Sequence, residues 1–197
     1  MLKDLLANKR LILASSSPRR RLLLEGVDLE FTVEVNNDIP EEFESSMDIN
    51  LVPEHLARLK SSGFGRRLSD SEILVTADTL VLCGGKILGK PTDRSDAFRM
   101  LKMLSGDKHT VLTGVCIRDN CRERSFTSET IVYFRELKDD EIYYYIDNYA
   151  PYDKAGAYGA QDWIGYVAIS RIEGSYFNVM GLPIQRLYTE LESFLSD

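Results

Sequence analysis

The spacing of hydrophobic and polar residues predicts a chain in which short strands alternate with amphipathic helices. The apolar run 11–14 predicts a buried strand, and the alternation over 29–35 predicts a half-buried one. Apolar residues recur with helical spacing over 53–63 and 93–104, and each stretch ends at a glycine-containing stop signal. These patterns are typical of a mixed α/β protein.

The middle of the chain contains one carboxylate in an apolar setting. Residues 73–77 predict a buried strand, and the apolar residues 80–82 follow after Asp78 and Thr79. A Gly84-Gly85 turn then predicts a hairpin onto a further short strand. Because Asp78 interrupts the apolar run, we expect it at a strand end.

The second half of the chain continues the same alternation. We predict an antiparallel pair, a tyrosine-rich helix, two strands and a closing helix, at residues 110–117 with 125–134, 138–148, 163–172 with 176–179, and 183–195. The sequence contains no internal repeat or linker. We therefore expect one domain over residues 1–197, of the α/β or mixed α+β class.

Composition limits the classes of partner. Of 197 residues, 44% are hydrophobic and 28% charged, and the formal net charge is −7. An acidic balance argues against a nucleic-acid partner, which needs a basic face. The three cysteines form no CxxC pair, residues 1–10 lack the apolar core of a signal peptide, and no apolar run could cross a membrane. We expect a cytoplasmic protein without a membrane partner.

The segment Ser15-Ser16-Ser17-Pro18-Arg19-Arg20 is the strongest candidate for binding chemistry. It joins a predicted strand to a helix that begins near Pro18, with Ser17 as the N-cap. Free backbone N–H groups, hydroxyl groups and two guanidinium groups there favour an anion such as a phosphate. A serine-rich turn and a solvated arginine pair would also explain the segment.

Asp78 is the candidate catalytic carboxylate, because an unpaired buried carboxylate is costly. A salt bridge in the core is the alternative. Lys60 and Lys90 could add positive charge for phosphoryl chemistry, or could be ordinary solvated lysines. Glu41, in an acidic loop, could join Asp78 in holding Mg²⁺ or Mn²⁺. A loop that is acidic only because it is solvated would explain the glutamates equally well. With two histidines and no GxxxxGK[ST] motif, a zinc site, a Ser-His-Asp triad and a P-loop are poorly supported.

Taken together, these segments resemble the Maf family of nucleoside triphosphate pyrophosphatases, also called septum formation inhibitor Maf. The resemblance covers nearly the whole chain. Its blocks are Leu13–Arg20, Leu56–Lys60, Ala77–Thr79, Gly89–Asp93, Met103–Gly106 with His109, Tyr152–Gly159, Ile172–Tyr176 and Val179–Pro183.

The resemblance implies an elongated α/β fold similar to inosine triphosphate pyrophosphatases, with two lobes around a cleft. It also implies metal-dependent hydrolysis of a nucleoside triphosphate to a nucleoside monophosphate and pyrophosphate. The family's general-base aspartate matches Asp78. Its phosphate-binding positions match Ser15, Ser17, Arg20, Lys60 and Lys90, and its base-selective positions match Arg19, Thr79 and Gln161.

Two segments, Asp78-Thr79 and Ala157–Gln161, are similar to those of the branch that acts on dTTP and UTP. An amide such as Gln161 can donate to and accept from a pyrimidine edge. The chain departs from the family pattern at two places. Leu59 stands before Lys60 where a glutamate is common, and the usual acidic pair reads Asp38-Ile39-Pro40-Glu41-Glu42, so that either Glu41 or Glu42 could face the metal, with Glu41 preferred. Housecleaning of non-standard nucleotides is one physiological role consistent with such an activity.

The main alternative is a nucleotide-binding regulator of cell division that has no turnover. A nucleic-acid module is a third hypothesis, which the acidic composition disfavours. The oligomeric state stays open, with a homodimer as one option.

Overall fold

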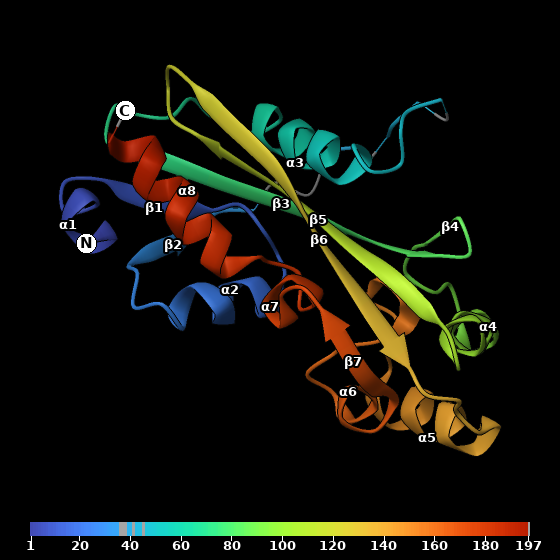
Figure 1. Ribbon diagram of the computed structural model, residues 1–197. Coiled ribbons are helices and arrows are strands. Elements are labelled where there is room, and N and C mark those ends of the chain that lie inside the picture. Colours follow the sequence, from blue (N-terminus) through green and yellow to red (C-terminus); the bar gives the residue numbers. More distant parts are fainter. Residues whose placement is uncertain (36–38, 41, 45, 197) are drawn as a thin grey trace. The chain divides into compact units, whose positions relative to one another are not determined.

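The computed structural model describes residues 1–35, 39–40, 42–44 and 46–196, and helices alternate with strands along them (Figure 1). The helices are α1 (Leu2–Leu5), α2 (Pro18–Glu25), α3 (Val52–Ser62), α4 (Arg94–Leu104), α5 (Asp139–Tyr149), the 3₁₀ helix η1 (Ala155–Ala157), α6 (Trp163–Ala168), α7 (Tyr176–Val179) and α8 (Ile184–Ser196). The strands are β1 (Arg10–Leu13), β2 (Phe31–Val33), β3 (Glu72–Cys83), β4 (Lys86–Leu88), β5 (Lys108–Arg118), β6 (Glu123–Phe134) and β7 (Ile169–Glu173).

The strands of the described residues form a mixed sheet. Its order is β2-β1-β3-β5-β6-β7, and β4 pairs with β3. Strand β1 runs parallel to both β2 and β3, whereas β4 is antiparallel to β3 and β7 is antiparallel to β6. The predicted mixed α/β class is therefore confirmed, while the cleft between two lobes stays a prediction.

The chain divides into two compact units. Unit 1 comprises Met1–Asp78, Thr113–Ser128 and Gly181–Asp197, and unit 2 comprises Thr79–Leu112 and Glu129–Met180. Strands β3, β5 and β6 each contribute residues to both units. One domain over residues 1–197 stays a prediction.

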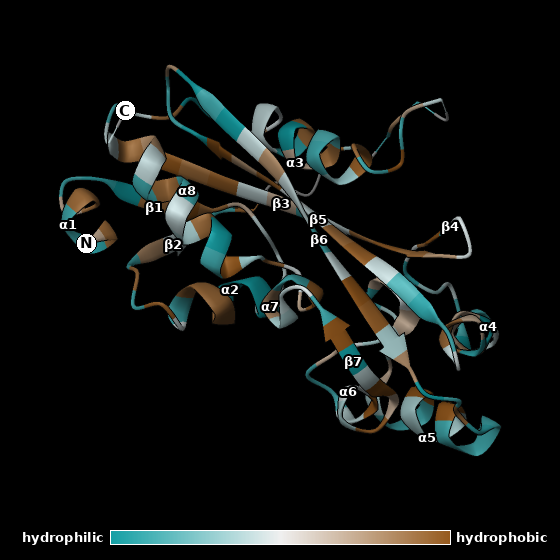
Figure 2. Ribbon diagram, in the orientation of Figure 1, coloured by the Kyte–Doolittle hydropathy of each residue, from teal (hydrophilic) through white to brown (hydrophobic). Residues whose placement is uncertain are grey.

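Unit 1 is held together by close packing of helix α3 on the strands. The Thr76 hydroxyl donates to the Ala57 carbonyl at 2.6 Å, and a Cβ on Gly114 would lie 2.1 Å from the carbonyl carbon of Pro53. Helix α2 lies on the opposite face of these strands from α3 (Figure 1). In Figure 2, much of β1 and the first part of β3 are brown, because apolar residues of these strands fill the space between the sheet and the helices.

Unit 2 has its own core, built on the remaining parts of the long strands. Helices α4 and α5 pack together through Phe98 and Tyr143, whose rings stack with centroids 4.6 Å apart. Arg94 of α4 also forms an ion pair with Asp147 of α5 at 2.7 Å. Elsewhere in unit 2, His109 Nε2 is hydrogen-bonded to the Tyr158 hydroxyl at 2.7 Å, and both residues are buried.

Most of the predicted elements are confirmed, but the strand predicted over 176–179 and the first part of the strand predicted over 163–172 are wrong, while residues 169–172 lie in β7 as predicted. Residues 163–168 form helix α6 and residues 176–179 form helix α7. In α6, the buried Ile164 and Ala168 lie four residues apart, so they share a helical face. In α7, the Ser175 hydroxyl accepts from the backbone N–H of Asn178 and caps the helix. The aromatic and β-branched composition of both segments imitated a strand.

The expected strand end at Asp78 is also wrong. Strand β3 continues through Asp78 and Thr79 to Cys83, where the Gly84-Gly85 turn leads into β4. Both turn glycines have positive φ, +55° and +73°, which glycine adopts without strain. The half-buried strand predicted over 29–35 is shorter, because only Phe31–Val33 pair with β1.

None of the helices described in the structure is long and apolar enough to span a lipid bilayer.

Candidate functional site

The serine-rich segment forms the turn between β1 and α2, as predicted. Ser17 is the N-cap residue with extended φ and ψ of −72° and 116°, and Pro18 is the first residue of α2. The Ser17 side chain makes no capping hydrogen bond; instead, its backbone N–H donates to Ser15 Oγ at 3.2 Å. The turn therefore folds back on Ser15, which is buried.

Arg20 extends from the first turn of α2 to three oxygen atoms. Its Nε donates to the Gly181 carbonyl at 2.8 Å, and its Nη1 donates to the Ala77 carbonyl at 2.8 Å and to Ser15 Oγ at 3.2 Å. These bonds join α2 to β3 and to the segment before α8. The planar guanidinium is fixed in orientation by donors that a lysine does not have.

Asp78 follows Ala77 in β3, and its carboxylate is paired with the Lys60 ammonium from the last turn of α3. The side chains of Lys60 and Asp78 are 21% and 11% exposed, so the pair lies at a surface that water and a ligand can reach. A carboxylate with a cationic neighbour satisfies the need for a partner in this apolar strand.

Unit 1 thus brings together five of the predicted site residues. Ser15, Ser17, Arg20, Lys60 and Asp78 are linked through the contacts of Ser15 and Arg20 and through the Ala77–Asp78 peptide. The group combines two cations, hydroxyl groups and a helix N-terminus with one carboxylate, a set that suits a multiply charged phosphate ligand. Arg19, the next residue after Pro18 in α2, is partly exposed.

Three further predicted residues belong to unit 2. Thr79 follows Asp78 in β3 and is partly buried. Lys90 is exposed just after β4, where the carbonyl of Gly89 accepts from the N–H of Gly156 at 3.0 Å. Gln161 lies in a turn before α6, in which the Asp162 N–H donates to the Gly159 carbonyl at 3.0 Å.

Sequence reasoning missed the residues that hold these groups in place. The carbonyls of Ala77 and Gly181 orient Arg20, and the Tyr145 hydroxyl contacts both ends of the Gln161 turn. Backbone carbonyls carry no signal in the sequence. Tyr145 occurs in a helix with several other tyrosines, and nothing in the sequence distinguishes its hydroxyl from theirs.

The predicted metal ligand Glu41 lies outside the described residues. Among those that are described, no group of three or more His, Cys, Asp or Glu side chains could enclose a metal ion. Asp78 offers one partly accessible carboxylate. That donor set suits a Mg²⁺-type ion held by one or two carboxylates, water and substrate phosphate oxygens, but not a site made of protein ligands alone.

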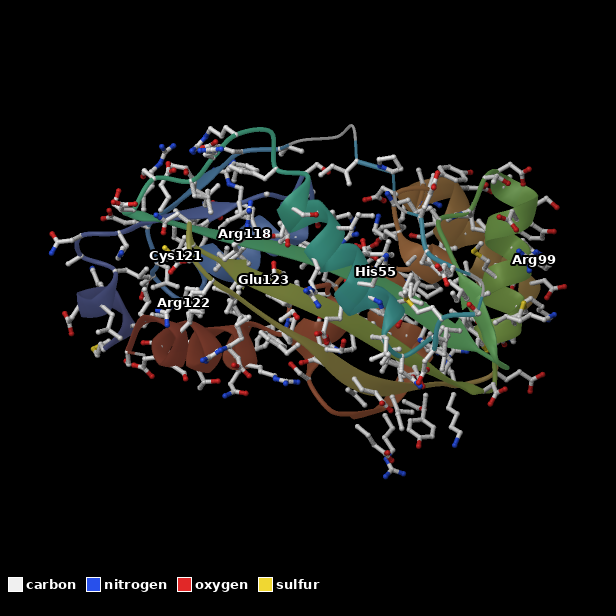
Figure 3. All side chains as sticks on the ribbon, turned by 90° about the horizontal axis from the view of Figure 1, so that it is seen from above. His55, Arg99, Arg118, Cys121, Arg122 and Glu123 are labelled. Atoms are coloured by element: carbon white, nitrogen blue, oxygen red, sulfur yellow. The ribbon has the colours of Figure 1, made fainter. Side chains whose placement is uncertain are left out.

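A second surface feature of unit 1 is a hollow of about 520 Å³ beside α3. His55 of α3 and Glu123 at the start of β6 both line it (Figure 3). None of the predicted site residues that the structure describes lines the hollow. Glu123 is paired with Arg58 at 2.8 Å, and Glu54 accepts from Ser125 Oγ at 2.6 Å, so these charged groups already have partners.

Comparison with known proteins extends the resemblance. A protein of Porphyromonas gingivalis named dTTP/UTP pyrophosphatase is 49% identical over 193 residues, which cover 97% of each chain. A protein of the same name from Flavobacterium johnsoniae is 43% identical over 195 residues, covering 99% of this chain and 100% of that one. The solved structure of a HAM1 protein from Coxiella burnetii shares the fold, with a TM-score of 0.50 at 13% identity, over 94% of this chain and 99% of that chain.

The family model described as Maf-like protein matches residues 10–194. This match spans the serine-rich turn, Lys60, Asp78, Lys90 and Gln161. The chain therefore belongs to the Maf family.

Proposed function

We propose that this protein is a nucleoside triphosphate pyrophosphatase that hydrolyses dTTP and UTP to the nucleoside monophosphate and pyrophosphate. The observation that carries the proposal is the grouping of one carboxylate with Lys60, Arg20 and the start of α2 in unit 1. The relatives named dTTP/UTP pyrophosphatase, which match almost the whole chain, support the same activity.

In the proposed reaction, water attacks the α-phosphorus of the substrate. One oxygen–phosphorus bond forms, the bond from the α-phosphorus to the bridging oxygen breaks, and pyrophosphate leaves with that oxygen. The Asp78 carboxylate has acceptor oxygens that can orient this water and take its proton. We assign this role to Asp78 because its carboxylate is paired with Lys60 and because it follows Ala77, whose carbonyl accepts a hydrogen bond from Arg20.

The phosphate chain carries several negative charges, which the site must balance. We assign Ser15, Ser17, Arg20 and Lys60 to phosphate binding, supported by their grouping at the start of α2 and the end of α3. Lys90 is proposed as a further phosphate contact from unit 2. Arg19, Thr79 and Gln161 are proposed as the residues that select the base.

A divalent cation, Mg²⁺ or Mn²⁺, fits the donor chemistry of Asp78 together with substrate phosphates, and when bound it would neutralise charge on the phosphates. Glu41 or Glu42 is the proposed second ligand. The described residues also include several carboxylates already paired with arginines, such as Glu72 and Glu141, and these are less suited to a metal.

The decisive experiment incubates the purified protein with dTTP, UTP, CTP and GTP, each with Mg²⁺ or Mn²⁺, and separates the products. We expect monophosphate and pyrophosphate from dTTP and UTP. Release of orthophosphate and a diphosphate instead would contradict the proposed bond cleavage. Absence of turnover with retained nucleotide binding would favour the regulator hypothesis. No specific feature of the described site supports that hypothesis.

A further inference from the structure

The turn that carries Gln161 is fixed at both ends by one hydroxyl group. Tyr145 is a fully buried residue of α5. Its hydroxyl accepts from the Gly159 N–H at 3.1 Å and donates to Asp162 Oδ2 at 2.8 Å. Because Gly159 and Asp162 are also joined by their own backbone hydrogen bond, Gln161 is enclosed in a doubly closed turn.

The Gln161 side chain packs tightly inside this turn. A Cβ on Gly159 would lie 2.9 Å from Gln161 Nε2 and 2.5 Å from Asp162 Oδ2, so a larger residue would displace both groups. Gly165 supports the turn from the next helix, since a Cβ there would lie 1.9 Å from the Ala160 carbonyl oxygen. The turn therefore has no room for a side chain at either glycine.

The amide oxygen of Gln161 has an unmet hydrogen-bonding capacity. Gln161 Oε1 is buried, and no described residue donates a hydrogen bond to it. A buried acceptor without a donor is costly, so a small movement of this partly exposed side chain that brings Oε1 to a ligand N–H group would be favourable. The N3–H of uracil or thymine is a donor of this kind, flanked by two carbonyl groups.

We propose that Tyr145 is a positioning residue for base recognition, which acts through Asp162 and Gly159 to hold the Gln161 amide oxygen toward the N3–H of a pyrimidine. The inference rests on the proposed function. It adds to that function two residues, Tyr145 and Asp162, whose contribution is to the affinity for the base and not to the chemistry on the phosphates.

The chemistry of the network supports a constant orientation. Burial and the neighbouring Asp162 raise the pKa of the Tyr145 phenol above its usual value, so the hydroxyl stays protonated and able to donate to the carboxylate. Asp162 Oδ2 also lies 3.8 Å from Lys154 Nζ, so the carboxylate that accepts from Tyr145 has a cation near it. The ring of Tyr145 stacks on Tyr149, with centroids 5.2 Å apart, and a phenylalanine would keep this contact.

The test compares Tyr145→Phe with the wild type in steady-state kinetics with UTP and dTTP. We expect KM to rise about 5- to 10-fold, the effect of loosening one hydrogen-bonded contact, while kcat changes less than about 2-fold. Dissociation constants for UMP should rise in parallel. The inhibition constant of tripolyphosphate, which has no base, should not change.

Tyr133→Phe is the matched control. It removes another tyrosine hydroxyl group of unit 2, but the partner of that hydroxyl is Glu173 at 3.1 Å and not the Gln161 turn. We expect its KM for UTP to stay within about 2-fold of the wild type. The variant Asp162→Ala should reproduce the effect of Tyr145→Phe, and the double variant should show no further rise in KM, because both act through one contact.

The outcomes separate the two proposals. If the wild type neither hydrolyses UTP nor binds UMP, the proposed function fails. Suppose that the wild type is active. The positioning role is then overturned if Tyr145→Phe leaves the KM for UTP unchanged, or if it weakens the binding of tripolyphosphate as much as the binding of UMP. Should Tyr145→Phe not fold, the comparison of Asp162→Ala with Tyr133→Phe decides by the same measurements.

Discussion

At the scale of single residues, the pairing of Asp78 with Lys60 determines what the site can do. Strand β3 is apolar on both sides of Asp78, and its partner comes from a helix 18 residues earlier in the chain. The pair is accessible enough for a phosphate or cation to compete for either charge. A buried structural pair would exclude such competition, because separating it would leave a charge without a partner.

Asp78→Asn keeps the size of the side chain and removes its negative charge. We expect a loss of at least ~10²-fold in kcat with dTTP, the scale on which removal of a general base acts. Binding of pyrophosphate should be retained or strengthened, because Lys60 loses its anionic partner. Wild-type turnover in this variant would contradict the role of Asp78.

Arg20 and its neighbour Arg21 offer a matched pair of substitutions. Arg20 donates to Ala77, Ser15 and Gly181, whereas Arg21 is exposed and paired with Glu25 at 2.8 Å. We expect Arg20→Lys to lower kcat/KM about 10-fold or more, because an ammonium cannot reproduce this fork of donors. Arg21→Lys should stay within about 2-fold of the wild type. Equal effects of the two, measured with UTP, would show that Arg20 acts only through its charge.

At the scale of elements, unit 2 contains a buried neutral histidine in β5, His109, which is hydrogen-bonded to Tyr158 just after η1. Burial lowers the pKa of His109 to about 4, and Asp107 opposes this shift only weakly. Its ring contacts Phe134 and Tyr158 edge to face, with centroids 5.0 Å and 5.3 Å away. A proton on His109 would therefore be buried among aromatic rings, which destabilises the folded state.

This arrangement predicts a pH dependence of stability. Because the unfolded chain binds the His109 proton near pH 6.5 and the folded protein only near pH 4, the free energy of unfolding should fall by up to about 3 kcal/mol as the pH drops across that interval. Urea unfolding at pH 7.0, 5.5 and 4.5 measures the fall. His109→Gln should show a smaller fall.

The interval above pH 4.5 isolates the histidine. Carboxylates with lowered pKa values, such as Glu72 at about 2 beside Arg66, lose their contribution only below their unfolded value of 4.5. An equal loss in the wild type and in His109→Gln between pH 6.5 and 4.5 would assign the effect to other groups.

At the scale of the whole molecule, two compact units share three long strands. Each of the strands β3, β5 and β6 begins in one unit and ends in the other, so the same continuous strand contributes backbone hydrogen bonds to both units. Such continuity favours a single cooperative transition, as expected for one domain.

The only tryptophan of the chain, Trp163, lies in unit 2 and reports its unfolding. Far-ultraviolet circular dichroism reports both units. We expect the two signals to give one midpoint in urea, both in the wild type and in Gly114→Ala, which overpacks unit 1 against Pro53 and should cost about 1–3 kcal/mol. Gly26→Ala, with its nearest contacts at an ordinary 3.5 Å, is the control. Separate midpoints would mean that the units unfold independently.

Local patterns were sufficient wherever one segment fixes its own structure. The strand and turn before Pro18, the helix over 52–62 and the hairpin at Gly84-Gly85 all follow from periodicity, capping and glycine at positive φ. They failed at residues 163–168 and 176–179, where a strand-like composition forms helices. There the buried contacts of Ile164, and of Asn178 with Val111 and Thr130, outweigh local propensity.

The sequence by itself determined the mixed α/β class, the position of the Ser15–Arg20 turn at the start of α2 and, through the order of its motifs, membership of the Maf family. Only the tertiary structure decided that Asp78 lies within β3 and not at its end, that Lys60 is its partner, and that Tyr145 closes the Gln161 turn. The physical reason is the range of the interactions. Periodicity and capping act over a few residues, whereas an ion pair or a buried hydroxyl contact joins residues whose separation in sequence says nothing about their distance in space.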